Sequence, residues 1–328
     1  MPTQRRAWLA ASAAFALGAA ALPAAHAQVK WDLPAAYPAT NFHTMNLVDF
    51  ASDIDKATGG KLKITVHPNA SLFKAPEIKR AVQGGQAQIG EVLLVNFQNE
   101  WQIFGADGIP FFADSYDASV KLWKAQKPLL DKKLGEQGLM VLYAVPWPPQ
   151  GVYSKKPLQS AADLKGMKWR AYSPATARIA ELVGAQPVTV QAAEVSQAFA
   201  TGVAESMMSS GSTGWDAKLH EHVKYWYDTQ AWLPKNAVLV NKAAFDALDA
   251  PTKAAVMKAA ADAEVRGLAA SKKANGESLD KLKGGGMQIL PPTAQLKADM
   301  KKVGDTMLKE WLDKAGPEGK ALVDAYMK

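Results

Sequence analysis

The sequence predicts an α/β protein made of two lobes. Segments with strand-like spacing of apolar residues alternate with segments of helical spacing, first over residues 28–93 and again from Leu139 onward. Such alternation favours parallel sheets with helices on their faces. A proline-rich break, Pro146–Gly151, follows the first strand of the second set and reads as a crossover between lobes. We therefore expect each lobe to be a mixed, mostly parallel sheet flanked by helices.

The N-terminal segment has the features of an export signal. Arg5 and Arg6 precede an apolar run, and Ala25–Ala27 is a small-x-small cleavage site. The run is short and alanine-rich for a membrane span, so a retained anchor is the weaker alternative. The arginine pair also suggests twin-arginine export, but no fuller motif accompanies it. We expect a signal peptide over residues 1–27, cleaved near Ala27/Gln28.

Composition excludes several classes of function. The formal charge of +7 becomes +5 when the two signal-peptide arginines are subtracted, and the lysines are dispersed along the chain. This disfavours nucleic-acid binding, which needs a clustered basic surface. The chain has no cysteine, so it forms no disulfide and performs no thiol chemistry.

Four elements are expected in the first set. Helical spacing over His43–Ala57 ends at a glycine pair, and a second helix begins at Pro76. Alternating or apolar runs predict strands at Lys61–Val66 and Gln88–Leu93.

The second set repeats this alternation. The predicted strands are Met140–Val145, Lys168–Tyr172, Pro187–Val190 and Glu205–Ser209. Helices are expected from Ser173–Pro174, where a capping residue precedes proline at the first position, and over Ala192–Thr201.

The C-terminal third contains an unusually long helix. After a strand at Ala237–Asn241, an Ala- and Lys-rich tract runs from Pro251 to about Lys283, long enough to brace both lobes. A short strand at Met287–Leu290 and two amphipathic helices follow. We expect lobe I to hold residues 28–147 with a return segment of about 235–260. Lobe II then holds 148–234 with about 261–328.

Arg170 is the strongest candidate for a binding residue. It lies on a predicted strand just before a helix start, and α/β proteins bind ligands beyond the carboxyl ends of such strands. A guanidinium there can hold a carboxylate through two parallel hydrogen bonds. The alternative is a surface arginine paired with a neighbouring acid.

Hydroxyl and aromatic side chains supply weaker candidates. Ser209 ends another predicted strand, although helix capping is the more common role for the hydroxyls that follow it. Most aromatic residues belong to a core or a lobe interface. Trp147, Trp215 and Trp232, however, lie at predicted element ends, where a cleft would form.

Catalytic and metal-binding patterns are weak. His220 and His222 are two positions apart, so their side chains diverge on a helix, and no third ligand has suitable spacing for zinc. No nucleophile elbow, phosphate-binding loop or dinucleotide fingerprint is present. We expect no cofactor and no metal; an exported enzyme on this fold is the alternative.

The segment Asp163–Arg170 resembles the substrate-binding proteins of TRAP (tripartite ATP-independent periplasmic) transporters, whose pattern there is D-L-K-G-x-K-x-R. Further matches follow in the same order along the chain: Phe50–Ala51, Thr58–Leu62, Gly90–Glu91, Gly184–Pro187, Ala193–Val195 and Ala200–Val203.

This resemblance implies a two-lobed, type II-like periplasmic-binding-protein fold that closes on a small organic acid. It also implies a periplasmic location and partners among the TRAP membrane permease subunits, driven by an ion gradient. In that family the arginine matching Arg170 binds the ligand carboxylate. Glu91 and Asn236 join the expected ligand-binding set, and a monomer is expected. An ATP-driven or signalling receptor is the competing class.

Two departures from the family pattern bear on the ligand. Many members have a second arginine where this chain has Gln150, and commonly an asparagine where it has Ser209. A second buried carboxylate would lack charge compensation. We therefore expect a monocarboxylate, with aromatic and 2-oxo or 2-hydroxy acids among the candidates.

Overall fold

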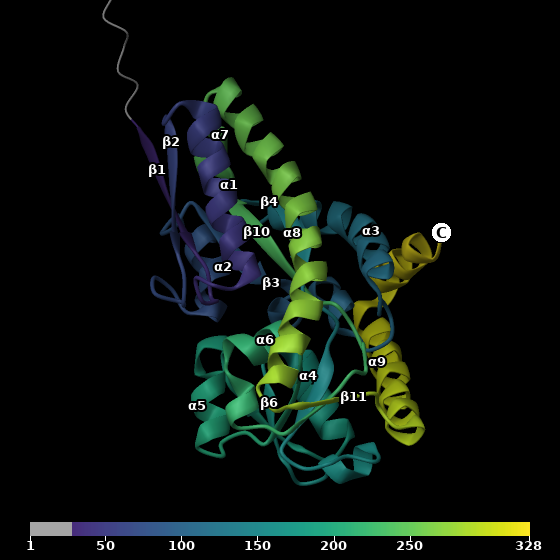
Figure 1. Cartoon of the computed structure of the whole chain (residues 1–328). Helices are drawn as coiled ribbons and strands as arrows, with labels where there is room; N and C mark the ends of the chain where they lie inside the picture. The colour runs from purple at the N-terminus through teal and green to yellow at the C-terminus, as the bar shows by residue number, and fades with distance from the viewer. Residues whose placement is uncertain (1–27) are drawn as a thin grey trace, which may run out of the picture.

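The structure, a computed structural model, describes residues 28–328 as two lobes joined by a long helix (Figure 1). The expected signal peptide, residues 1–27, lies outside the described residues. Within the described part of the chain, no helix is long and apolar enough to cross a membrane.

The first lobe contains two small sheets. Strands β1 (Val29–Pro34) and β2 (Leu62–His67) pair in parallel and are connected by helix α1 (Phe42–Thr58). The second sheet has the order β3-β10-β4, and both of its pairings are antiparallel. Its strands are β3 (Ile89–Leu93), β4 (Leu139–Pro146) and β10 (Lys235–Asn241), and helix α2 (Ala75–Gln83) precedes β3. The parallel pairing expected here therefore holds for β1 and β2 only, because β10 returns from the other lobe and inserts between β3 and β4.

The second lobe is built on one mixed six-stranded sheet of order β11-β9-β5-β8-β6-β7. Three of its five pairings are parallel. The strands are β5 (Gly151–Ser154), β6 (Lys168–Ala171), β7 (Gln186–Thr189), β8 (Ser206–Ser209), β9 (Tyr225–Tyr227) and β11 (Gln288–Leu290). Three short helices flank it: α4 (Pro174–Leu182), α5 (Val195–Ala200) and α6 (Gly211–Asp216).

Two chain segments cross between the lobes side by side. Residues 147–150 connect β4 to β5, and residues 228–234 connect β9 to β10. The backbone N–H of Trp147 donates to the carbonyl of Pro234 at 2.8 Å, and Gln150 exchanges backbone hydrogen bonds with Trp232 and Ala231. The crossovers therefore form one hydrogen-bonded strap.

The expected long helix is confirmed as α8 (Ala250–Gly284), which follows the short helix α7 (Lys242–Asp246) and runs along both lobes (Figure 1). Val256 and Ala260 are buried in the core of the first lobe, whereas Leu282 is buried in a core of the second. Gly267 lies where α8 touches β4: a Cβ atom added there would come within 2.3 Å of Val145 Cγ2. The helix therefore braces the two lobes as predicted.

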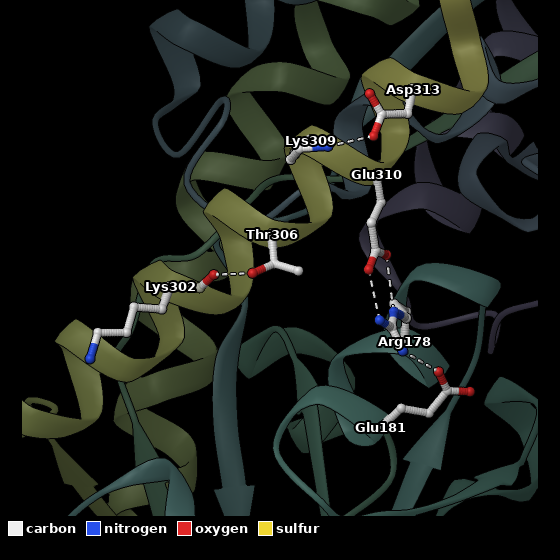
Figure 2. Close-up of polar contacts among 7 residues, drawn as sticks. All are labelled: Arg178, Glu181, Lys302, Thr306, Lys309, Glu310 and Asp313. Atoms are coloured by element: carbon white, nitrogen blue, oxygen red, sulfur yellow. Dashed lines mark hydrogen bonds and ion pairs between the residues drawn. The ribbon is translucent and has the colours of Figure 1, made fainter.

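Helix α9 (Ala294–Met327) closes the chain and is bent at Gly316, whose φ of 57° and ψ of −139° are not helical. The bend separates the two C-terminal helices that were expected. Figure 2 shows the face of α9 that meets α4, where Glu310 accepts two hydrogen bonds from Arg178 at 2.7 and 3.0 Å. Trp311 donates from Nε1 to the carbonyl of Gln102 at 2.8 Å, in the 3₁₀ segment Gln102–Gly108. Helix α9 also packs against α3 (Tyr116–Gly135) of the first lobe.

Candidate functional site: a ligand cavity between the lobes

A cavity of about 180 Å³ lies where the two lobes meet. The first lobe and the crossover contribute Tyr37, Asn96, Trp147 and Gln150, and the second lobe contributes Arg170, Tyr172, Ser209 and Asp216. Among the described residues that line it, Arg170 is the one cation and Asp216 the one acid.

Arg170 is buried in this cavity without an acidic partner. Its side chain is 3% exposed, Nε donates to the carbonyl of Val190 at 2.9 Å, and the guanidinium lies 4.8 Å from the Tyr172 ring centroid. Within residues 28–328 its two Nη atoms form no hydrogen bond and no carboxylate pairs with it. The surface position considered as an alternative is therefore wrong.

Burial lowers the pKa of Arg170 to about 10, against the opposing influence of Tyr172 and Tyr37. The guanidinium therefore stays charged at neutral pH. Leaving a buried charge unpaired costs several kcal/mol, on the order of what a buried ion pair loses when one partner is removed. The site is thus electrostatically prepared for an anion.

The turn after β6 fixes the backbone behind Arg170. Ser173 caps α4, with its Oγ accepting from the N–H of Thr176 at 3.2 Å. Thr176 Oγ1 in turn accepts from the N–H groups of Tyr172 and Ser173 at 3.0 Å each. The predicted cap-then-proline start is confirmed, and it sets the direction in which Tyr172 leaves the strand.

Gln150 is held by both ends of its amide. Nε2 donates to the carbonyl of Pro148 at 2.9 Å, and Oε1 accepts from the Tyr172 hydroxyl at 3.4 Å. The side chain is 2% exposed. It therefore supplies a neutral, oriented dipole to the cavity and positions Tyr172, which itself lies against Arg170.

Trp147 forms an aromatic wall with Tyr37. Their ring centroids are 4.8 Å apart in an edge-to-face arrangement. Trp147 Nε1 donates to Asn236 Oδ1 at 2.9 Å, so Asn236 supports Trp147 from behind the wall and does not line the cavity itself.

The structure brings four of the eight predicted residues to the cavity: Arg170, Gln150, Ser209 and Trp147. The other four are not among the lining residues. Glu91 is buried with Oε1 3.4 Å from His43 Nδ1, and Trp232 is buried in the crossover strap. Trp215 is 37% exposed and stacks on His220, while Asn236 lies behind Trp147.

Sequence reasoning missed Tyr172 and Asp216 as lining residues. Tyr172 was detectable, because positions 170 and 172 point to the same side of an extended segment. Asp216, at the end of α6, had no such signal, because its place depends on how the two lobes meet. Burial raises the pKa of Asp216, and its Oδ2 accepts from Asn41 Nδ2 at 2.6 Å.

Comparison with known proteins identifies the family. Residues 35–314 match the DctP family of bacterial extracellular solute-binding proteins, family 7. This chain belongs to the DctP family. The expected relationship to TRAP substrate-binding proteins and the expected two-lobed fold are confirmed.

Three relatives show the range of this similarity. DctP6, a Bordetella pertussis extracytoplasmic solute receptor binding pyroglutamic acid, is 60% identical, with 91% of this chain and 99% of that chain covered and a TM-score of 0.90. A marine metagenome TRAP solute binding protein specific for pyroglutamate is 45% identical, with 92% and 99% covered and a TM-score of 0.90. The C4-dicarboxylate-binding periplasmic protein DctP of Rhodobacter capsulatus is 26% identical over 83% of each chain.

DctP proteins are periplasmic receptors that bind small organic acids for a TRAP permease. This chain is therefore a TRAP solute-binding protein. Its family consists of transport receptors, not of an enzyme class.

Proposed function

We propose that this DctP protein captures a monocarboxylate of the pyroglutamate type in the periplasm and delivers it to its permease. Arg170 holds the carboxylate through two parallel hydrogen bonds. The observation that carries this proposal is the buried guanidinium whose Nη atoms have no partner within residues 28–328. A carboxylate supplies both the missing charge and two acceptors.

The charges of the cavity favour one carboxylate over two. A second carboxylate would meet the neutral Gln150 amide and the acidic Asp216 rather than another cation. Its desolvation would be uncompensated, and Asp216 would repel it. This supports a monoanion.

Pyroglutamate fits these demands because it carries a single carboxylate on a small, compact lactam ring. Two relatives that are 60% and 45% identical to this chain bind pyroglutamate, and the ring can lie against the Tyr37–Trp147 wall. The aromatic, 2-oxo and 2-hydroxy acids expected from the sequence are the natural comparison ligands.

Replacing Arg170 tests the proposal. In Arg170→Ala we expect calorimetric binding of pyroglutamate to fall below detection, since removing one partner of a buried pair costs about 3–5 kcal/mol. The thermal unfolding transition should stay cooperative. Arg80→Ala, at an exposed arginine of α2, is the matched control and should bind as the wild type does. Unchanged affinity in Arg170→Ala would overturn the assignment.

The remaining expectations are part of the same proposal. Lobe I comprises residues 28–147 and about 235–260, and lobe II comprises 148–234 and about 261–328. The protein acts as a monomer after cleavage near Ala27/Gln28, binds no nucleic acid and catalyses no reaction on the bound acid. Recovery of the unchanged ligand from purified protein by mass spectrometry tests the last point.

A further inference from the structure

One side-chain hydrogen bond joins the two lobes beside the cavity. Asn41, at the N-terminus of α1 in the first lobe, donates from Nδ2 to Asp216 Oδ2 of α6 in the second lobe at 2.6 Å. Asn41 is 1% exposed, and Asp216 lines the cavity. The contact can exist only while the lobes are together, so it is a feature of the closed protein.

The direction of this hydrogen bond is fixed by the helix cap. Asn41 Oδ1 accepts from the backbone N–H of His43 at 2.9 Å, as an N-cap residue does. Because the atom that accepts from this N–H must be the amide oxygen, the other terminal atom of the Asn41 side chain is the NH₂ donor. Asp216 therefore meets Asn41 with an accepting oxygen, Oδ2, and its other oxygen, Oδ1, takes no part in this contact.

Asp216 has accepting capacity left over. Oδ1 forms no hydrogen bond with any residue in the range 28–328, and no ion pair connects Asp216 with Arg170. The cavity therefore requires two things of a ligand: two hydrogen-bond acceptors for the guanidinium of Arg170 and one hydrogen-bond donor for the carboxylate of Asp216. A hydroxyl or an N–H group can donate, whereas an ether or ester oxygen cannot.

We propose that Asp216 is a specificity-determining residue that selects acids presenting a hydrogen-bond donor, and that Asn41 positions it by linking it to the opposite lobe on closure. This inference rests on the proposed function and refines its ligand. The donor is the ring N–H of a lactam acid such as pyroglutamate; the ring ammonium of proline offers the same chemistry with an added charge.

Paired ligands test the donor requirement. L-Pyroglutamate and its lactone analogue, 5-oxotetrahydrofuran-2-carboxylate, have the same shape and carboxylate, but the lactone has oxygen where pyroglutamate has N–H. We expect the wild type to bind pyroglutamate at least about tenfold more tightly in calorimetry, because hydrogen bonds to charged groups are the stronger kind. L-Proline, measured alongside, separates a neutral N–H from an ammonium: tighter binding of proline than of pyroglutamate would overturn the lactam assignment.

Two variants separate specificity from folding. In Asp216→Asn the new amide keeps its hydrogen bond with Asn41 through its oxygen and turns its NH₂ toward the cavity. The preference for pyroglutamate over the lactone should then vanish or reverse. In Asn41→Ser a good helix cap is retained while the donor to Asp216 is lost. Affinity for pyroglutamate should fall several-fold. In small-angle scattering, a higher ligand concentration should be needed before the protein becomes compact.

The possible failures are distinguishable. Equal binding of lactam and lactone by the wild type, or an unaltered preference in Asp216→Asn, overturns this inference. If Arg170→Ala still abolishes binding in that case, the proposed function stands. If the wild type binds neither ligand, both proposals fail. An Asn41→Ser variant with wild-type affinity and scattering removes the positioning role alone.

Discussion

Charged side chains with little solvent access occupy contrasting environments in this protein. Arg170 faces the cavity with no acidic partner among residues 28–328, whereas Lys235 and Asp107 are buried together, with Nζ 3.9 Å from Oδ2. Asp107 Oδ2 also accepts from the backbone N–H of Lys235 at 2.8 Å, at the end of the second crossover. The first arrangement suits a ligand, and the second ties the crossover to the 3₁₀ segment of the first lobe.

The carboxyl of Asp107 gives stability a specific pH dependence. Burial raises its pKa from 3.8 to about 6, despite the nearby charge of Lys235. Because the folded state holds the proton more tightly, the associated stability is fully present below pH 3.8 and is lost as pH rises through 6. Relative to Asp107→Asn, the wild type should lose on the order of 2 kcal/mol of unfolding free energy across this window.

Chemical denaturation at several pH values between about 4 and 7 measures this trend. Asp114→Asn, at an exposed carboxyl group, serves as the control and should follow the wild type. A constant difference between wild type and Asp107→Asn across the range would contradict the prediction.

Among the secondary-structure elements, α8 offers a test of close packing within one helix. Gly267 lies against Val145, where an added Cβ would approach Cγ2 to 2.3 Å, while Gly276 in the same helix has nothing within 4 Å. Gly267→Ala should destabilise the protein by about 1–3 kcal/mol through overpacking. Gly276→Ala should stabilise it by about 0.5–1 kcal/mol through better helix propensity. Thermal and chemical unfolding of the two variants check the opposite signs; equal effects would contradict the packing at Gly267.

The contact between α4 and α9 is a weaker element-level interaction. Arg178 is bidentate to Glu310 and also donates to Glu181 (Figure 2), which raises the pKa of Arg178 and lowers that of Glu310. Both side chains of the Arg178–Glu310 pair are about one-third exposed or more, so solvent screens them and the pair contributes about 1 kcal/mol or less. Its value lies in fixing the orientation of α9 across the lobes.

For the whole molecule, the sequence was most informative where structure is local. Helix α8, the start of α4 and strand β6 follow from spacing, capping residues and proline. Strands β5 and β9 and helix α3 were not predicted, since these two short strands lack a clear alternation and α3 contains Pro128. Strand β1 was also missed, although Trp31 and Leu33 alternate there with polar residues. Strand β10 pairs antiparallel with β3 and β4 because the chain returns from the second lobe to the first. No local sequence pattern encodes that return.

The cavity shows the same division. Arg170 was found because its strand and the following helix start are visible in the sequence. Asp216 and Asn41 are 175 positions apart in the sequence, so only the folded arrangement of the lobes reveals their contact. The predicted residues Glu91 and Asn236 both lie on strands. The side chain of Asn236 supports the cavity wall, and that of Glu91 is buried in the interior.

The length of α8 also constrains how the protein can open. Its 35 residues form a rod of about 50 Å at 1.5 Å per residue, and its two ends are buried in different lobes. A continuous helix cannot stretch without breaking its hydrogen bonds, so opening must turn or bend the lobes about this rod.

Spin labels at Met257 and Lys283 should keep the same separation with and without ligand. Labels at Asn69 and Ser196, on opposite sides of the cavity, should move closer together on binding. The fixed length of α8 thus provides an internal distance reference for measuring how the lobes move.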